Sequence, residues 1–201
     1  VVIILISVIT ILSGVAAWFI LSDDDGGKNT AIGSLRSGLT EVVSVLKMPI
    51  VWLISIVVLA AYSAYWGTYR FTSYSTDIFS LSVVVAGAIS IGKMAMSPPS
   101  ALVAGFISDK IGIAKSVSIL FVILILSFLI FAFMPGLPLL LPFMITNIAI
   151  ASLAVFALRG IYFALLEEGG IPMKVTGTAT GFISMIGFTP DIFMPLIGGL
   201  L

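Results

Sequence analysis

The sequence contains no cysteine and no histidine. The chain therefore cannot form a disulfide, use a thiolate, or supply the imidazole that often serves as metal ligand or general base. Charged residues are also scarce, at 9% of 201 residues, against about 25% in a typical soluble domain. The formal net charge is zero, so nothing indicates binding to nucleic acid. We expect no cofactor, no metal and no nucleic-acid partner.

Apolar residues are abundant: 60% of the chain is hydrophobic and its mean hydropathy is +1.29. Six apolar segments are each near or above the ~20 residues that a helix needs to cross ~30 Å of hydrocarbon. Barrel strands need only ~10 residues, so these lengths predict an all-α, polytopic helical bundle in a membrane. The chain begins and ends inside such segments, and we expect a fragment of a larger membrane protein. The segments are residues 1–21, 49–66 with a more polar continuation to 79, 81–104, 113–134, 138–166 and 176–201.

The longest polar connection covers residues 22–48. It opens with three aspartates and two glycines, which predict a solvated linker. It then carries apolar residues at helical spacing, which form one stripe on a helix flanked by charged residues. This pattern is typical of an amphipathic helix that lies on the membrane surface. The stripe consists of Leu35, Leu39, Val42, Val43 and Leu46.

Basic residues are concentrated in alternate connections. The first, third and fifth connections hold Lys28, Arg36, Lys47, Lys110, Lys115 and Lys174. The fourth holds none, and the second has only Arg70 nearby. The positive-inside rule therefore predicts that the odd connections are cytoplasmic and the even ones external.

A charged turn at residues 105–115, G-F-I-S-D-K-I-G-I-A-K, joins the third and fourth apolar segments. It resembles the loop motif G-x-x-x-D-[RK]-x-G-[RK]-x-[RK] of the major facilitator superfamily. A basic residue is usual at position 113, where this chain has isoleucine. The matching residues are Gly105, Asp109, Lys110, Gly112 and Lys115.

The resemblance implies that the six segments are helices six to eleven of a twelve-helix transporter. Residues 1–21 would end the N-terminal half, 22–48 would be the cytoplasmic inter-domain loop, and 49–201 would be the C-terminal half, truncated before its last helix. Gly105, Asp109, Lys110 and Gly112 would latch neighbouring helices in one access state. The helix dipole favours a carboxylate at a helix N-terminus, and glycines allow close approach. The alternative is a solvated turn whose lysines set only the topology.

Four charged residues lie within the apolar segments, where a charge costs about 2.5–3.5 kcal/mol on insertion scales. Lys93 and Asp191 fall near the expected midplane, and Arg159 lies in the cytoplasmic half of the fifth segment. Arg70 lies seven residues from Asp77, so a local pair is expected there. Residues 116–134 of the fourth segment hold no charged residue, and the resemblance places that segment against lipid. Structural ion pairs and snorkelling of long side chains are the alternatives to a role in the cavity.

The second segment carries an aromatic and hydroxyl stripe at helical spacing. Such a face can donate hydrogen bonds to a polar solute from a cavity wall. An interfacial aromatic belt is the alternative, although Tyr62 and Tyr65 lie deep for one. The stripe contains Tyr62, Tyr65, Trp66, Tyr69, Ser73 and Thr76.

Three smaller features predict local structure. The prolines at 98 and 99 should kink the third segment. Pro190 breaks a helix hydrogen bond beside Asp191 and can open a hinge. Glu167 and Glu168 belong to a turn, and we expect their carboxylates to be solvated.

These features favour a secondary transporter, not an enzyme, in a bacterial inner membrane. Its partners would be a small solute, protons and the bilayer, and it would act as a monomer. Tyr62, Tyr65, Tyr69, Lys93 and Arg159 would bind the solute. The excess of positive charge favours an organic or inorganic anion, with Asp191 alternating between a proton and Lys93. A neutral sugar or drug-like solute, or a membrane-embedded enzyme, are the alternative functions.

Overall fold

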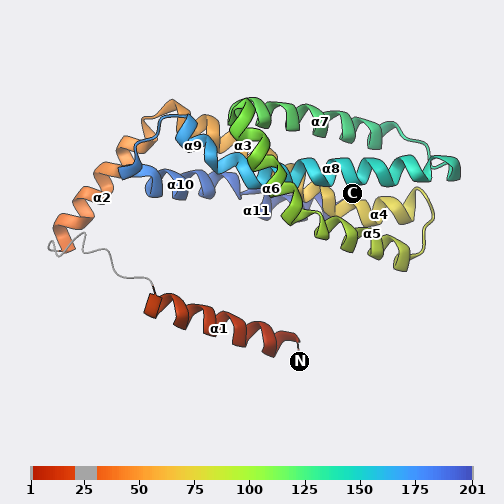
Figure 1. Cartoon of the computed structure of the whole chain (residues 1–201), viewed down its shortest axis with the longest axis horizontal. Coiled ribbons are helices and arrows are strands. Elements are labelled where there is room, and N and C mark those ends of the chain that lie inside the picture. Colours follow the sequence, from red (N-terminus) through yellow and green to blue (C-terminus); the bar gives the residue numbers. More distant parts are fainter. Residues whose placement is uncertain (1, 21–30, 201) are drawn as a thin grey trace. The chain divides into compact units, whose positions relative to one another are not determined.

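The computed structural model describes residues 2–20 and 31–200, and all regular structure in these ranges is helical (Figure 1). The chain divides into two compact units, Val1–Thr40 and Glu41–Leu201. The first contains α1 (Val2–Ile20) and the start of α2 (Ala31–Leu46), and the second contains the rest of the chain. The predicted all-α fold is confirmed.

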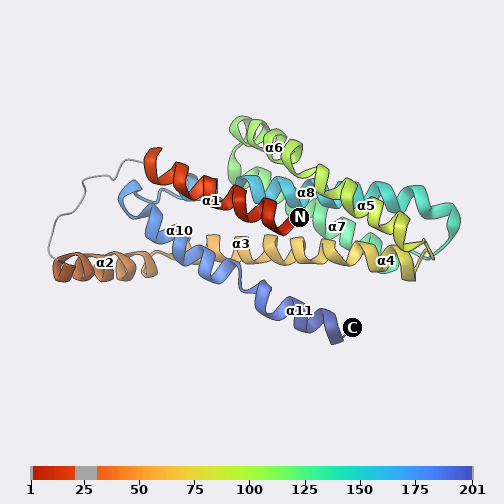
Figure 2. The same cartoon turned by 90° about the horizontal axis from the view of Figure 1, so that it is seen from below.

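The second unit is built from long apolar helices, several of which are interrupted by short 3-10 turns. The turns η1 and η3 lie between consecutive helices of one segment, and η2 directly precedes α8. Figures 1 and 2 show the helices in two views. In chain order the elements after α2 are α3 (Pro49–Gly67), η1 (Thr68–Arg70), α4 (Phe71–Asp77), α5 (Val83–Ala95), α6 (Ser97–Ile111), α7 (Ile113–Phe133), η2 (Pro138–Leu140), α8 (Leu141–Ile161), η3 (Tyr162–Ala164), α9 (Leu165–Glu168), α10 (Met173–Gly187) and α11 (Pro190–Leu200).

Within the described ranges, four helical segments are long and apolar enough to cross a membrane: Pro49–Asp77, Ile113–Phe133, Pro138–Glu168 and Met173–Gly198. Two of the six predicted spans are absent from this set. The first contributes only a shorter apolar helix, Ile6–Phe19. The third is divided into α5 and α6, each too short to cross alone.

Prolines account for the interruptions of two predicted segments. α5 ends at Ala95, and α6 begins at Ser97 with prolines in its first turn. Proline is tolerated there because the first backbone N–H groups have no partner inside the helix. The predicted kink in the third segment is therefore confirmed. Likewise α10 ends at Gly187, and Pro190 begins α11 after two intervening residues.

The helix α8 lies at the centre of the second unit and packs against α6, α7 and α3. Its buried residues include Leu158 and Val155, which are fully enclosed. The side-chain amide of Asn147 donates a 3.0 Å hydrogen bond to the backbone oxygen of Ser127 and ties α8 to α7. α10 packs on α3, where Gly187 leaves room for the side chain of Val58.

The outer surface of the second unit is apolar. Along α7, the side chains of Ile119, Val122, Ile125 and Leu126 are all about half exposed or more. A soluble protein rarely leaves such a continuous face uncovered, whereas lipid is the natural solvent for it. This agrees with the expected contact between the fourth apolar segment and lipid.

The predicted amphipathic helix exists as α2, although the apolar stripe is not its buried face. Leu39, Val42, Val43 and Leu46 are exposed, whereas Val45 is buried in the core. An uncovered apolar stripe beside a polar face suits a helix that lies in the membrane interface. Lys28 and the linker before it lie outside the described residues.

Candidate functional site

The helix α3 and the turn η1 present four aromatic residues on one face, which we name the aromatic stripe: Tyr62, Tyr65, Trp66 and Tyr69. Their spacing of three and four residues places them on neighbouring turns of one helix face. The ring centroids of Tyr65 and Tyr69 are 5.3 Å apart, and their hydroxyl oxygens are joined by a 2.7 Å hydrogen bond. The ring of Tyr62 lies 5.7 Å from that of Tyr65. The stripe is therefore a continuous row of rings and hydroxyl groups.

Arg159 of α8 reaches the middle of the aromatic stripe. Its Cζ atom lies 4.2 Å from the ring centroid of Tyr65 and 5.9 Å from that of Tyr62. A guanidinium in this position is attracted by the negative faces of the rings. Among residues 2–20 and 31–200, no carboxylate forms an ion pair with Arg159. The cation is held by aromatic faces, and its side chain also interacts with the hydroxyl of Tyr162.

Asp191 of α11 accepts hydrogen bonds from two residues of the aromatic stripe. Its Oδ1 atom accepts a 2.8 Å hydrogen bond from the indole Nε1 of Trp66, and its Oδ2 atom accepts one of 3.2 Å from the hydroxyl of Tyr62. Asp191 lies in the first turn of α11, where the helix dipole favours a carboxylate. The carboxylate thus fastens α11 to α3.

Lys93 of α5 contacts the Tyr69 end of the stripe and is 5% exposed. Its Nζ atom donates to the backbone oxygen of Thr68 at 3.0 Å and to the Thr68 hydroxyl at 3.3 Å. It also lies 5.0 Å from the ring centroid of Tyr69. Two neutral acceptors and an aromatic face compensate the buried charge.

The structure brings all the predicted solute-binding residues to one surface, but it pairs them differently from the sequence-based expectation. Asp191 was expected to alternate between a proton and an ion pair with Lys93. Here Lys93 binds Thr68, and Asp191 binds Trp66 and Tyr62. Sequence alone could place both charges near the midplane, but it could not give their directions around the bundle.

Arg70 also differs from its expected arrangement. Its guanidinium lies against Gly198 of α11, where a side chain would collide with it. Asp77 instead accepts a 3.0 Å hydrogen bond from the hydroxyl of Thr76, and within the described ranges no ion pair joins it to Arg70. Arg70, Tyr69 and residues of α11 line a cavity of about 370 Å³. The cavity therefore adjoins one end of the aromatic stripe.

A third difference from expectation concerns the charged turn between α6 and α7. Asp109 lies in the last turn of α6, not at a helix N-terminus, because α6 continues beyond the apolar segment to Ile111. Gly112 ends that helix with φ +95°, a conformation that other residues rarely adopt. Asp109 and Lys110 are both exposed.

The carboxylate that binds a helix N-terminus is that of Glu168, which is exposed as predicted but also has a partner on α7. Its Oε2 atom accepts a 2.8 Å hydrogen bond from the backbone nitrogen of Ala114, the second residue of α7. A charge-assisted bond to a free N–H group in the first turn also interacts favourably with the helix dipole. No local sequence signal connects Glu168 to α7, because they are more than fifty residues apart.

The close helix approach expected at Gly105 occurs elsewhere within the described chain. A Cβ atom built at Gly105 would meet nothing within 4 Å. At Gly160 of α8, by contrast, it would lie 2.9 Å from the Cβ atom of Ala101 in α6. Gly160 therefore permits the α6–α8 contact, and Gly105 leaves an open face.

The helices and their exposed apolar surfaces define an integral membrane protein of the polytopic helical class. The family model of the Major Facilitator Superfamily matches residues 1–195, and the chain belongs to this family, as its charged turn indicated. It is 31% identical to Inner membrane protein YqcE of Escherichia coli (strain K12), over 98% of this chain and 48% of that protein. It is 28% identical to Inner membrane protein YihN of the same organism, over 93% and 46%.

The chain spans about half the length of the curated relatives it matches. Both relatives are named as inner membrane proteins, and the predicted location in an inner membrane is confirmed. No solved structure matches the chain with significance.

Proposed function

We propose that the chain is the second half, with the preceding helix and linker, of a secondary transporter that moves a small anion by alternating access. Residues 1–21 end the N-terminal half, 22–48 connect the halves, and 49–201 form the C-terminal half. In this arrangement the solute binds near the midplane, between the two halves. The protein acts as a monomer in the bilayer.

The observation that carries the anion proposal is the position of Arg159 on the ring of Tyr65. A guanidinium has five donors in a planar fork, which can bind a carboxylate or phosphate through two parallel hydrogen bonds. Here the aromatic faces and the hydroxyl of Tyr162 hold the cation, and a fork of five donors has room for an anion besides. The neighbouring tyrosine hydroxyls add donors that suit the same anion.

Lys93 supplies a second positive charge to this surface. An ammonium group has three donors, and Thr68 accepts from the Lys93 nitrogen at two atoms. One donor is left to face a solute beside Tyr69. Burial strengthens the attraction between this charge and an anion because the local dielectric constant is low.

Asp191 is the proposed site of proton coupling. Its ionised carboxylate accepts hydrogen bonds from Trp66 and Tyr62 and so holds α11 against α3. Protonation removes the charge, which weakens both bonds. The break between α10 and α11 lets the second helix move separately. A proton taken up at Asp191 would thereby change the access state.

A neutral solute is the second candidate, because Tyr62 contacts both Arg159 and Asp191. If these opposite charges offset each other, the stripe would suit a sugar or a drug-like molecule. A membrane-embedded enzyme is disfavoured because the sequence has no cysteine or histidine nucleophile or base. Within the described residues, no group of metal-ligating side chains compensates for this.

Uptake by the full-length protein in proteoliposomes tests the solute class. Arg159→Lys keeps the charge but loses the planar fork, and Lys93→Ala removes the second cation. We expect each variant to lower anion uptake roughly tenfold, the effect of losing one or two charge-assisted hydrogen bonds. Lys174→Ala, which removes an exposed cation at the start of α10, is the matched control. Uptake of sugars but of no anion by the parent protein would favour the neutral alternative.

Coupling is tested separately with Asp191→Asn. This variant keeps the side-chain shape and removes the titratable group, so a proton gradient should no longer drive accumulation. Exchange of labelled for unlabelled solute at equal pH should persist. Asp77→Asn, which alters an exposed carboxylate of α4, should retain both activities. Gradient-driven accumulation by Asp191→Asn would remove Asp191 from the coupling mechanism.

A further inference from the structure

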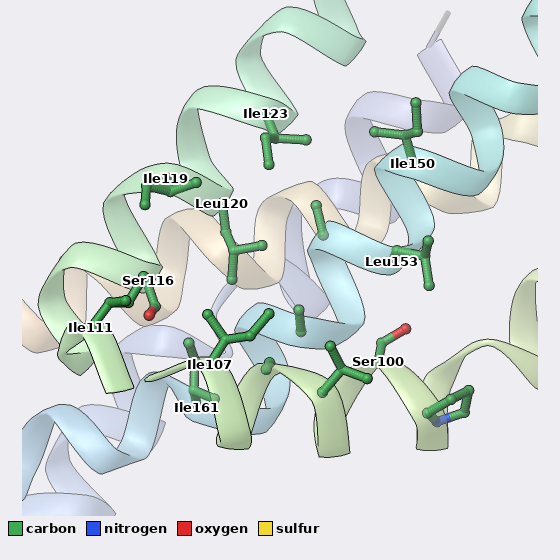
Figure 3. Close-up of a pocket in the computed structure, with 15 residues that line it drawn as sticks. Ser100, Ile107, Ile111, Ser116, Ile119, Leu120, Ile123, Ile150, Leu153 and Ile161 are labelled. Atoms are coloured by element: carbon green, nitrogen blue, oxygen red, sulfur yellow. The ribbon is translucent and has the colours of Figure 1, made fainter. Parts of the chain in front are cut away.

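Two cavities of the second unit differ in the chemistry of their walls. The larger, of about 540 Å³, lies between α6, α7 and α8, and Figure 3 shows Ile107, Ile119 and Leu153 converging on it. Its side chains are apolar except for two serines, whose hydroxyls donate within their own helices. The smaller, of about 370 Å³, lies between the end of α3, η1, α4 and α11, and it has an arginine in its wall. Only the smaller cavity therefore offers a charged group to a ligand.

Arg70 of η1 lies in the wall of the smaller cavity with its guanidinium against Gly198 of α11. Within residues 2–20 and 31–200, no hydrogen bond or ion pair engages this guanidinium. Ser73, three residues further on the same face, adds a hydroxyl that also has no hydrogen-bond partner among those residues. The cavity volume lies within the range of about 300–1,000 Å³ that is usual for ligand pockets. The wall thus presents unused donors to a space that can hold a small solute.

The balance of charge around the cavity favours an anion. Away from the charged residues of its predicted cytoplasmic end, the second unit has one more cation than carboxylates. The groups counted are Arg70, Lys93 and Arg159 against Asp77 and Asp191.

Neither carboxylate lines the cavity. Asp77 lies seven residues from Arg70, and Asp191 lies seven residues from Gly198, which corresponds to about 10 Å along each helix. The Coulomb energy falls with the inverse of distance, so at equal dielectric constant two charges at about 10 Å repel an anion less than one guanidinium at about 4 Å attracts it. Contact with Arg70 therefore outweighs repulsion by both carboxylates.

The depth of the cavity sets it apart from the proposed solute site. Arg70 lies 21 residues after Pro49, the first residue of α3, or about 30 Å at ~1.5 Å per residue. This length equals the ~30 Å thickness of the hydrocarbon core. Under the predicted topology, Arg70 therefore lies at the external boundary of the membrane, and Tyr62 lies about 12 Å deeper.

The aromatic stripe connects the cavity to Arg159. Tyr69 lines the cavity, and its hydroxyl is joined to that of Tyr65 by a 2.7 Å hydrogen bond. The ring of Tyr65 in turn holds Arg159, and Lys93 lies 5.0 Å from the ring centroid of Tyr69. Cations and hydroxyl groups thus follow one another from the external boundary to the deeper site.

We propose that this cavity is an external entry site, where Arg70 and Ser73 bind the anionic solute before it reaches Arg159. This inference rests on the proposed function of anion transport and adds the residues that first capture the solute. A guanidinium fork can bind a carboxylate or a phosphate through two parallel hydrogen bonds. A cation at the mouth of a site also raises the rate at which anions encounter it.

Uptake by the full-length protein in right-side-out and inside-out membrane vesicles tests the entry site, with inorganic phosphate and succinate as the probes. We expect Arg70→Gln to raise KM for uptake from the external face roughly tenfold, the lower end of the gain from electrostatic steering. The kcat value, and KM from the cytoplasmic face, should stay unchanged. Arg70→Lys keeps the charge and should retain most of the parental affinity. At 1 M salt the Debye length falls to about 3 Å, so parent and Arg70→Gln should become similar.

A second variant displaces the guanidinium without removing its charge. A Cβ atom at Gly198 would meet the end of the flexible Arg70 side chain, so Gly198→Ala should move the guanidinium and raise the external KM severalfold. Gly177→Ala, whose new Cβ atom would meet nothing within 4 Å of the described chain, is the matched control. Lys174→Gln is the control for loss of an exposed cation elsewhere.

The outcomes separate this site from the proposed function. Uptake of neither probe by the parent protein would overturn anion transport and the entry site together. Parental uptake with an unchanged external KM in Arg70→Gln would overturn the entry site alone. An equal rise in KM from both faces, or a fall in kcat without a change in KM, would also overturn it, because Arg70 would then act on the deeper site or on the fold.

Discussion

The Oε2 atom of Glu168 lies 2.8 Å from the backbone nitrogen of Ala114 and accepts its hydrogen bond. This contact joins the end of α9 to the start of α7. It places a carboxylate at the helix N-terminus beside the family motif, although the motif's own carboxylate, Asp109, lies at the end of α6. Two carboxylates near the same turn thus have different roles.

Glu168→Ala should destabilise the protein by about 1 kcal/mol, the usual cost of losing a helix N-terminal acceptor and its interaction with the dipole. Glu168→Gln keeps an acceptor oxygen and should lose less. Thermal unfolding of the full-length protein in detergent measures both effects. Glu167→Ala, at the exposed neighbouring position, should leave the midpoint unchanged. Equal midpoints for Glu168→Ala and Glu167→Ala would show that the bond contributes nothing.

Gly112→Ala should also be destabilising, by about 1–2 kcal/mol, because φ is +95° at this residue. Gly105→Ala is the matched control, since its new Cβ atom would meet nothing within 4 Å of the described chain. The two variants can be compared by their thermal midpoints in the same detergent. A normal midpoint for Gly112→Ala would mean that the turn can adopt another backbone path.

Asp109→Asn should impair transport while leaving expression and thermal stability largely intact. Asp109 is exposed in this half of the protein, so its removal costs little folding energy here. The proposed latch acts instead on the access equilibrium, where ~1.4 kcal/mol changes the ratio of states tenfold. Transport assays and unfolding curves separate the two effects. A parental transport rate would reduce Asp109 to a residue that only shapes the turn.

The basic turns of the second unit lie together at one of its two ends. Contacts of Glu168 with Ala114, and of Gly169 with Ile50, bring the starts of α3 and α7 and the end of α9 together. Gly136 lies against Ile78 at another pair of turns. The basic turns therefore lie on the same side, as the positive-inside rule requires.

Single cysteines can test this topology directly, because the chain has none of its own. Ser108 is buried, so Lys110 is a better position for a label. In intact cells, an impermeant reagent should label Leu137→Cys, which is exposed between α7 and η2, and should not label Lys110→Cys. The opposite labelling pattern would invert the predicted orientation.

The sequence by itself determined the helical class and the membrane environment, because apolar segments of this length have no other stable form in lipid. Prolines also marked two breaks within these segments. The Pro98–Pro99 pair, for example, separates α5 from α6. The charged turn indicated the family because its motif lies within eleven consecutive residues and can be read directly from the sequence.

Only the tertiary structure decided which groups meet. Helical spacing could place Tyr62, Tyr65 and Tyr69 on one face, but the packing of α8 brings Arg159 to that face. The packing of α11 likewise places the carboxylate of Asp191 within hydrogen-bond distance of Trp66 and not beside Lys93. Glu168 reaches α7 because α9 ends beside it. These pairings depend on the rotation and crossing of helices that are distant in sequence, and the pattern within a single helix carries no information about them.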